Sequence, residues 1–190
     1  MNHFFAYINR MKHINRWGLM KNTEMENLSE HSFQTAILSH ALAVIERDNF
    51  NSEIDPYRTA VKALYHDVSE IITGDMPTPV KYFNEEITVS YKKIEKRSKD
   101  ALIEKLPDGM KNEFSDIINA EESPEWAIVK AADTLSAYIK CIEEIKAGNP
   151  EFSGAGKTIK AKLENMNLKC LNYFMDEFLP SYYLNIDELK

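Results

Sequence analysis

Apolar residues recur along this chain at intervals of three and four positions, the spacing of helices that bury one face. No segment alternates between apolar and polar residues for long enough to form a sheet. We therefore expect an all-α fold in which residues 1–190 form a single domain. The pattern predicts helices over Phe4–Met11, from Asn27 past Ile45, from Asp55 to just before Gly74, and over about Asn84–Leu106, Asp108–Ala120, Ser123–Gly148 and Thr158–Phe178.

Local signals support the ends of several of these helices. Asn27 and Glu30 have the spacing of a capping box, and Pro56 follows Asp55 at a first helical position, where its missing N–H costs nothing. The segment Gly74–Pro79 contains two prolines and is predicted to be a loop. The positions expected to face the core are Leu28, Phe33, Ile37, Leu38, Ala41 and Ile45; Ile87, Tyr91, Ile94, Ser98, Leu102 and Leu106; and Ile128, Ala131, Ala132, Leu135, Ile139, Ile142 and Ile145.

The composition and the charge narrow the classes of partner. Hydrophobic residues make up 44% and charged residues 28% of the chain, which excludes a disordered protein. The net charge of −7 argues against polymeric nucleic acid and acidic membranes, because both bind basic faces. A small phosphorylated ligand stays compatible with this charge, since a metal ion and one or two basic side chains reverse the field locally.

The remaining bulk features indicate a cytoplasmic protein. Cys141 and Cys170 lack the spacing of a disulfide framework or a zinc site, so we expect two reduced thiols. Polar residues interrupt the first ten positions too often for a signal peptide. The longest apolar run, Ala41–Ile45, is far shorter than the roughly 20 residues of a membrane span.

Four side chains stand out as candidate metal ligands. His66 and Asp67 are adjacent at the end of an apolar stretch, and His31 and Asp133 lie on two other predicted helices. Histidine combined with carboxylate suits borderline transition metals, and two of each leave positions for water and a phosphate oxygen. A lone histidine such as His31 is usually a core or surface residue, and an adjacent His–Asp pair occurs by chance in many proteins. Asp133 is less ordinary, because a buried unpaired carboxylate within an apolar helix is costly. The set of four on predicted helices favours a metal site.

Three further residues have the chemistry of a phosphate-processing site. Glu70 follows His66 by one helical turn, which predicts either an acid/base carboxylate beside the metal or a solvated charge at a helix end. The guanidinium of Arg16 suits a phosphate group. Trp17 offers a flat wall for a base or a sugar, although its residue type alone favours a place in the core.

Several blocks of the chain resemble the bacterial YfbR-like HD-domain 5′-deoxynucleotidases, and the resemblance extends over essentially the whole sequence. The blocks are Ile14–Trp17, Glu26–Ser32, Tyr65–Glu70, Thr73–Phe83, Val129–Asp133, Ala137–Cys141 and Tyr173–Met175. The resemblance implies an HD-domain helical bundle that hydrolyses 2′-deoxyribonucleoside 5′-monophosphates to the deoxynucleoside and phosphate. It also implies one divalent metal ion, with Co²⁺ or Mn²⁺ expected.

The resemblance also assigns roles to residues. The metal ligands would be His31, His66, Asp67 and Asp133, of which His31 and Asp133 would also contact the substrate. Glu70 would be the acid/base carboxylate, Arg16 would hold the phosphate, Trp17 would crowd a ribose 2′-hydroxyl, and Asp75 would contact the sugar. The resemblance further implies a homodimer, and the aromatic residues expected to supply an apolar interface are Tyr173, Phe174, Phe178, Tyr182 and Tyr183.

Two departures and two alternatives qualify this assignment. The turn Ala120–Pro124 is shorter than the resemblance predicts, and Phe152–Thr158 is richer in glycine. The latter segment imitates the end of a P-loop, but the first glycine of that motif would fall at Glu151 and no strand precedes it.

One alternative is an HD phosphohydrolase for cyclic or oligophosphorylated nucleotides, which needs more lysine or arginine near the site or a second metal. The other is a non-catalytic nucleotide sensor, which would have lost Glu70 or a metal ligand.

Overall fold

The computed structural model describes all 190 residues and is helical throughout, which confirms the predicted all-α class. Backbone pairing of the β type occurs only as one isolated antiparallel bridge between Asn15 and Asn27. No helix is long and apolar enough to cross a membrane. The helices are α1 (Phe4–Ile8), α2 (Leu28–Phe50), α3 (Pro56–Leu64), α4 (Glu70–Thr73), α5 (Thr78–Lys81), α6 (Glu85–Ile103), α7 (Asp108–Ile118), α8 (Trp126–Lys146), α9 (Phe152–Glu164) and α10 (Lys169–Glu177), with short 3₁₀ turns at Met11–His13, Leu179–Tyr183 and Ile186–Glu188.

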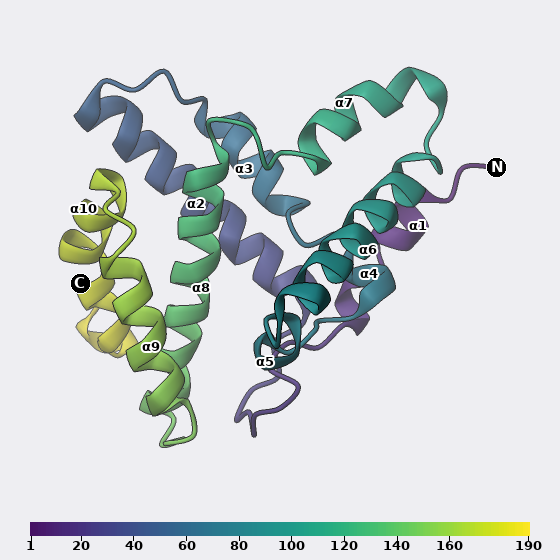
Figure 1. Cartoon of the computed structure of the whole chain (residues 1–190). Helices are drawn as coiled ribbons and strands as arrows, with labels where there is room; N and C mark the ends of the chain where they lie inside the picture. The colour runs from purple at the N-terminus through teal and green to yellow at the C-terminus, as the bar shows by residue number, and fades with distance from the viewer.

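The main core lies where α2, α8, α9 and α10 pack together (Figure 1). Leu42 of α2, Leu135 of α8, Leu163 of α9 and Leu171 of α10 are all buried within it. Helix α3 packs along α2 and also touches α8. This arrangement sets the first turn of α2 and the first half of α8 beside the end of α3.

A second, smaller core lies under α1, α6 and α7, on the opposite side of Figure 1 from α9 and α10. Its members include Phe4 of α1, Leu102 of α6 and Ile118 of α7. Phe4 meets the ring of Phe114 edge to face at 5.0 Å. Val68, from the segment between α3 and α4, is fully buried in the same cluster. The segment that follows α3 is therefore tied to this second core.

The predicted helix starts at Asn27 and Asp55 are confirmed by their caps. The side chain of Asn27 accepts hydrogen bonds from the backbone N–H groups of Ser29 and Glu30, and Glu30 completes the capping box. Asp55 caps α3 in the same manner, with Pro56 in the first turn. At the other end of α8, Gly148 has the left-handed conformation that favours glycine (φ +84°).

The predicted helix from Asp55 to Gly74 is wrong, because α3 ends at Leu64 and α4 begins only at Glu70. His66 and Asp67 therefore lie in a tight turn and not on a helix. The physical reason is a hydrogen bond of 2.7 Å between His66 Nδ1 and the carbonyl of Ala63, the group that Asp67 N–H would bind in a continuous helix. Burial of Val68 in the second core holds the turn in place.

The predicted helix Thr158–Phe178 is also wrong in its limits. It is divided into α9 and α10 near Asn167, which adopts a left-handed conformation (φ 51°). The glycine-rich segment Phe152–Thr158 belongs to α9. A Cβ added at Gly156 would stand 3.4 Å from Cys141, so this glycine lets α9 approach α8 closely. The predicted loop Gly74–Pro79 runs into the short helix α5 at Thr78.

Four residues predicted to face the core are exposed instead. Phe33 and Ile37 on α2 expose 58% and 49% of their surface, and Ile94 of α6 and Ile145 of α8 are exposed to a similar extent. Helical spacing identifies an apolar stripe, but how much of it is covered depends on where neighbouring helices end.

Candidate active site

The four candidate metal ligands converge from three parts of the chain. His31 comes from the first turn of α2, His66 and Asp67 from the turn after α3, and Asp133 from α8. One ligand atom from each of them lies within 4.8 Å of the others. His31 Nε2 is 3.2 Å from Asp133 Oδ1, and His66 Nε2 is 3.0 Å from Asp67 Oδ2. The structure thus brings together the residues that the sequence singled out.

The orientation of His66 leaves one nitrogen available to a cation. Its Nδ1 lies 2.7 Å from the carbonyl of Ala63, so Nδ1 carries the proton in the neutral ring and donates it there. Its Nε2 is buried and has no hydrogen-bond partner of suitable geometry. A buried nitrogen lone pair that faces a second imidazole and two carboxylates fits a divalent metal ion.

The electrostatics of the cluster favour bound positive charge. Burial lowers the pKa of the His66 imidazole, but the carboxylates of Asp67 and Asp133 outweigh burial and raise this pKa to about 10. Burial raises the pKa of Asp133, but Lys130 and the two histidines outweigh it and hold this pKa well below its usual range. Both carboxylates are therefore ionised at neutral pH, the state in which they bind metal.

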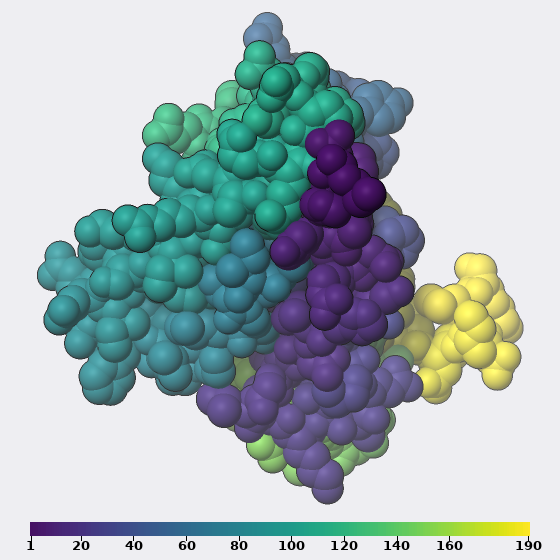
Figure 2. Space-filling model, turned by 90° about the vertical axis from the view of Figure 1, so that its right-hand side faces the viewer, coloured from purple at the N-terminus to yellow at the C-terminus, as the bar shows by residue number.

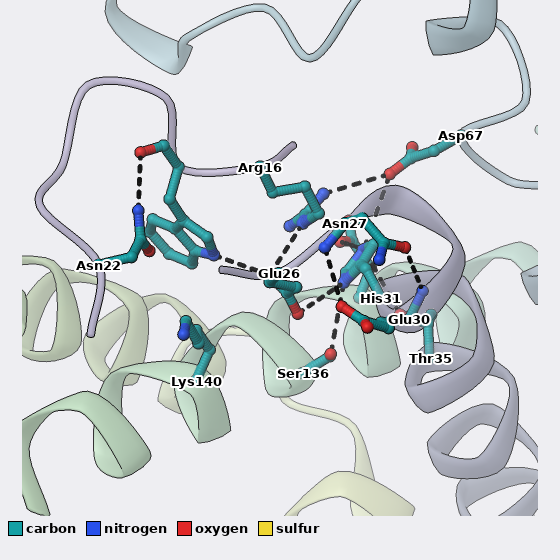
Figure 3. A network of polar contacts seen from close by, with 12 residues as sticks. Arg16, Asn22, Glu26, Asn27, Glu30, His31, Thr35, Asp67, Ser136 and Lys140 are labelled. Carbon is teal, nitrogen blue, oxygen red and sulfur yellow. Dashed lines mark hydrogen bonds and ion pairs between the residues drawn. The ribbon is translucent and has the colours of Figure 1, made fainter. Parts of the chain in front are cut away.

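Glu26 connects the cluster to Arg16 and Trp17 (Figure 3). Its Oε2 accepts one hydrogen bond from Arg16 Nε at 3.2 Å and another from the Trp17 indole N–H at 2.8 Å. Its Oε1 lies 3.9 Å from His31 Nδ1. Arg16 in turn places Nη1 3.5 Å from Asp67 Oδ2. One carboxylate thus contacts two of the predicted substrate-binding residues, Arg16 and Trp17, and approaches the candidate metal ligand His31.

The backbone around Trp17 is held in an unusual conformation. Trp17 has φ 60°, in the left-handed region that non-glycine residues rarely adopt. The bridge between Asn15 and Asn27 closes the segment, and Arg16 N–H donates to the carbonyl of Glu26 at 2.9 Å. The indole also packs against the Phe152 ring at 5.2 Å. Trp17 is half-buried and does not belong to either main core.

The loop between Trp17 and Asn27 is anchored on α8 by a buried carboxylate. Glu144 accepts hydrogen bonds from the backbone N–H of Thr23 at 2.9 Å and from Asn149 Nδ2 at 2.8 Å. Lys140 binds Glu144 at 2.5 Å and the carbonyl of Glu24 at 2.6 Å. These contacts fix the position of the segment that carries Glu26.

Glu70 and Asp75 lie among the same charges. Glu70 is the first residue of α4, 7% exposed, and its Oε2 is buried without a hydrogen-bond partner. Burial, together with the nearby carboxylates of Asp67 and Asp75, raises the pKa of Glu70 to about 9. Burial also raises the pKa of Asp75, against the opposing charge of Arg16. Asp75 follows Gly74, whose φ of +73° turns the chain back toward the cluster.

Sequence reasoning gave no role to Glu26 or to Lys130. Lys130 Nζ lies 2.8 Å from Asp133 Oδ2, one helical turn away on α8. The spacing of three residues between a lysine and a candidate ligand could have identified Lys130. The contacts of Glu26 could not have been identified in this way, because they depend on the bridge between two extended segments.

Comparison with known proteins finds relatives that match almost the whole chain. A family model described as 5′-deoxynucleotidase YfbR-like matches residues 3–182. Two curated relatives, the 5′-deoxynucleotidases YfbR of Salmonella newport and Salmonella agona, are each 48% identical over 191 residues. Each alignment covers 100% of this chain and 96% of the relative.

Solved structures show the same architecture at lower identity. An HD-domain phosphohydrolase from Listeria innocua superimposes with a TM-score of 0.81 at 22% identity, and the match covers 95% of this chain and 88% of that one. The HD phosphohydrolase DatZ of cyanophage S-2L, solved with dA and one catalytic Zn²⁺ ion, gives a TM-score of 0.67 at 20% identity, with 93% and 95% covered. The HD-domain helical bundle is thereby confirmed.

Proposed function

The chain belongs to the YfbR-like 5′-deoxynucleotidase family, and we propose from this membership and from the site that it hydrolyses 2′-deoxyribonucleoside 5′-monophosphates to the deoxynucleoside and inorganic phosphate. The observation that carries the proposal is the convergence of His31, His66, Asp67 and Asp133 within 4.8 Å, with His66 Nε2 unpartnered. Residues 1–190 would act as one phosphohydrolase domain.

The four converging residues would hold one divalent metal ion. Imidazole and carboxylate together suit a borderline transition metal, and we propose Co²⁺ or Mn²⁺. A bound ion of this kind polarises a phosphoryl oxygen and lowers the pKa of water toward about 7. Lys130 restrains Asp133 at 2.8 Å, and the carbonyl of Ala63 fixes the ring of His66, so the donors are oriented before substrate arrives.

Arg16 would bind the phosphate group of the substrate. Its Nε is already occupied by Glu26, so the guanidinium is held with its other N–H groups toward the metal ligands. Glu70 would transfer a proton at its unpartnered Oε2, either from the attacking water or to the leaving 5′-oxygen. The new P–O bond to water forms as the bond between phosphorus and the 5′-oxygen breaks.

Trp17 and Asp75 would select the sugar. The indole is held by Glu26 and by Phe152, and a rigid ring of this size excludes an added hydroxyl by steric contact. Asp75 supplies a carboxylate that accepts a hydrogen bond from a sugar hydroxyl. The role of Asp75 is supported by its partly buried position near the charge of Arg16. The role of Trp17 is supported by the Glu26 carboxylate, which binds both its indole and Arg16.

We further propose a homodimer located in the cytoplasm. Tyr173, Phe178 and Tyr183 expose 39%, 47% and 52% of their surface and are available to a second copy. Phe174 is buried in the main core and is therefore not available to a second copy. Figure 2 shows the C-terminal residues, in yellow, projecting from the body of the molecule, as a segment that reaches a partner would.

The test is phosphate release from a deoxynucleoside 5′-monophosphate and from the matching ribonucleotide, with added Co²⁺ or Mn²⁺ and with chelator. We expect metal-dependent release from the deoxynucleotide, at least about tenfold faster than from the ribonucleotide. Trp17→Ala should reduce this preference, and Glu70→Gln should lower turnover by about 100-fold or more. Metal-bound protein that releases phosphate from neither substrate would contradict the proposal and favour the sensor.

A further inference from the structure

A cavity of about 780 Å³ opens beside the metal ligands, within the size range of small-molecule sites. His66 and Asp67 form part of its wall, whereas Arg16, Trp17 and Asp75 do not. The cavity therefore begins at the metal ligands and extends away from the residues assigned to the sugar. A substrate phosphate at the metal would stand between the nucleoside and this space.

The wall of the cavity is unusually rich in lysine for a protein of net charge −7. Its lysines are Lys81, Lys92, Lys96, Lys99 and Lys130, and its carboxylates are Asp67, Glu95, Glu121 and Glu122. Three of the lysines are ion-paired, Lys81 with Glu95, Lys99 with Glu121 and Lys130 with Asp133. Lys92 and Lys96 form no ion pair in the structure.

The lysines have an ordered arrangement. Lys92, Lys96 and Lys99 are spaced at i, i+4 and i+7 on α6, so they share one face of the helix. Trp126 lies opposite, with Lys99 Nζ 6.0 Å and Lys130 Nζ 5.7 Å from the centre of its ring. Lys130 also contacts the ligand Asp133 at 2.8 Å. Lysines therefore border the cavity both beside Asp133 and along one face of α6.

We propose that this cavity binds the outer phosphates of a deoxynucleoside 5′-triphosphate whose first phosphate occupies the metal site. A triphosphate chain carries several negative charges, and two unpaired lysines on one face of α6, Lys92 and Lys96, are available to bind them. The inference rests on the proposed function, because the metal site must accept a nucleotide phosphate. Deoxynucleoside triphosphates would then compete with the monophosphate and inhibit its hydrolysis.

The experiment compares the wild type, the double variant Lys92→Ala/Lys96→Ala and the control Lys93→Ala. Lys93 is an exposed lysine on α6 that does not line the cavity. Inhibition of monophosphate hydrolysis by dATP is measured at a fixed free metal concentration, since triphosphates chelate divalent cations. We expect the inhibition constant to rise about tenfold in the double variant, or about threefold per lysine, with the KM for monophosphate nearly unchanged. Lys93→Ala should behave as the wild type.

Calorimetric titration of the same three proteins with inorganic triphosphate gives a readout independent of turnover. Tighter binding to the wild type and to Lys93→Ala than to the double variant would support the site. Equal inhibition by dATP and equal binding of triphosphate in all three proteins would overturn the proposed site. The proposal would also be overturned if Lys93→Ala weakened triphosphate binding as much as the double variant does. If monophosphates are not hydrolysed but triphosphate binding still depends on Lys92 and Lys96, the proposed function fails and the anion site stands. If monophosphates are hydrolysed and triphosphate does not bind, the inference alone fails.

Discussion

The carboxylate of Glu26 accepts hydrogen bonds from two of the side chains expected to contact the substrate, Arg16 and Trp17. Arg16 and Trp17 both donate to the same oxygen, at 3.2 Å and 2.8 Å, and neither has another carboxylate partner as close. A single carboxylate therefore sets the position of the Arg16 guanidinium, which is proposed to bind phosphate, and of the Trp17 indole. A substitution of Glu26 should therefore disturb the positions of Arg16 and Trp17 together, without removing a group that touches the substrate.

Glu26→Gln should lower kcat/KM by about tenfold and reduce the preference for deoxyribose, because a neutral amide holds both donors less firmly. The indole contact supplies a spectroscopic check. In a Trp126→Phe background, Trp17 is the only tryptophan, and its emission should shift when its N–H partner changes. Glu24→Gln, which changes an exposed side chain in the same loop, is the matched control. Unchanged emission and unchanged sugar preference would show that Glu26 does not position these residues.

At the scale of elements, the sequence predicted where helices begin more successfully than where they break. The caps at Asn27 and Asp55 depend on neighbouring residues and could be recognised from spacing alone. The break after Leu64 could not, because it depends on the hydrogen bond of His66 to Ala63 and on the burial of Val68 under distant helices. The four candidate ligands lie together in the structure, although the turn that carries two of them was predicted to be part of a helix.

The anchor between α8 and the Trp17–Asn27 loop should contribute measurably to stability. Glu144 is 2% exposed and accepts hydrogen bonds from Lys140, Thr23 and Asn149. Glu144→Gln should cost about 3 kcal/mol of unfolding free energy at pH 7, since it leaves the Lys140 charge unpaired in a buried position. Urea denaturation measures the cost. Glu143→Gln, an exposed neighbour, should cost far less.

The same anchor predicts a pH dependence. Burial raises the pKa of Glu144, but Lys140, Thr23 and Asn149 outweigh burial and hold this pKa well below its usual range. A carboxylate whose pKa is lower in the folded state stabilises the fold fully above its unfolded pKa of about 4.3, and the contribution declines as pH falls below that value. The difference in stability between wild type and Glu144→Gln should therefore narrow between pH 7 and pH 3.5. A constant difference would contradict an ionised Glu144.

The helix α9 offers a simpler test of element stability. Gly154 lies within α9, and a Cβ added there would meet nothing within 4 Å. Gly154→Ala should raise the unfolding free energy by about 0.5–1 kcal/mol, because alanine loses less backbone entropy in a helix. Gly74→Ala should act in the opposite direction, since Gly74 has φ +73°. Thermal melts of the two variants should move to opposite sides of the wild-type midpoint.

At the scale of the whole molecule, the ligand cluster joins the two cores. His31 and Asp133 belong to helices of the main core, whereas His66 and Asp67 precede Val68, which is buried in the second. The lysine-lined cavity and the Glu26 contacts also arise only from this assembly. Neither was evident in the sequence, because the residues are remote along the chain and ordinary in type.

A bound metal should therefore stabilise the molecule as one unit. At a free metal concentration of 100 times the dissociation constant, binding adds about 2.7 kcal/mol to the unfolding free energy. For a chain of this size the melting temperature should rise by about 5–10 °C, and chelator should reverse the rise. The variant Asp133→Asn should show little of this shift. Equal melting temperatures with metal and with chelator would indicate that the four side chains do not form a metal site.

The order of the ligands along the chain has a consequence for biosynthesis. His31 leaves the ribosome before Asp133, which follows about a hundred residues later, a delay of roughly 5–20 s at ordinary rates of translation. During that interval the nascent chain presents His31, His66 and Asp67 without the carboxylate that completes the set. On the proposed set of ligands, metal would be bound at full affinity only after α8 has emerged from the ribosome.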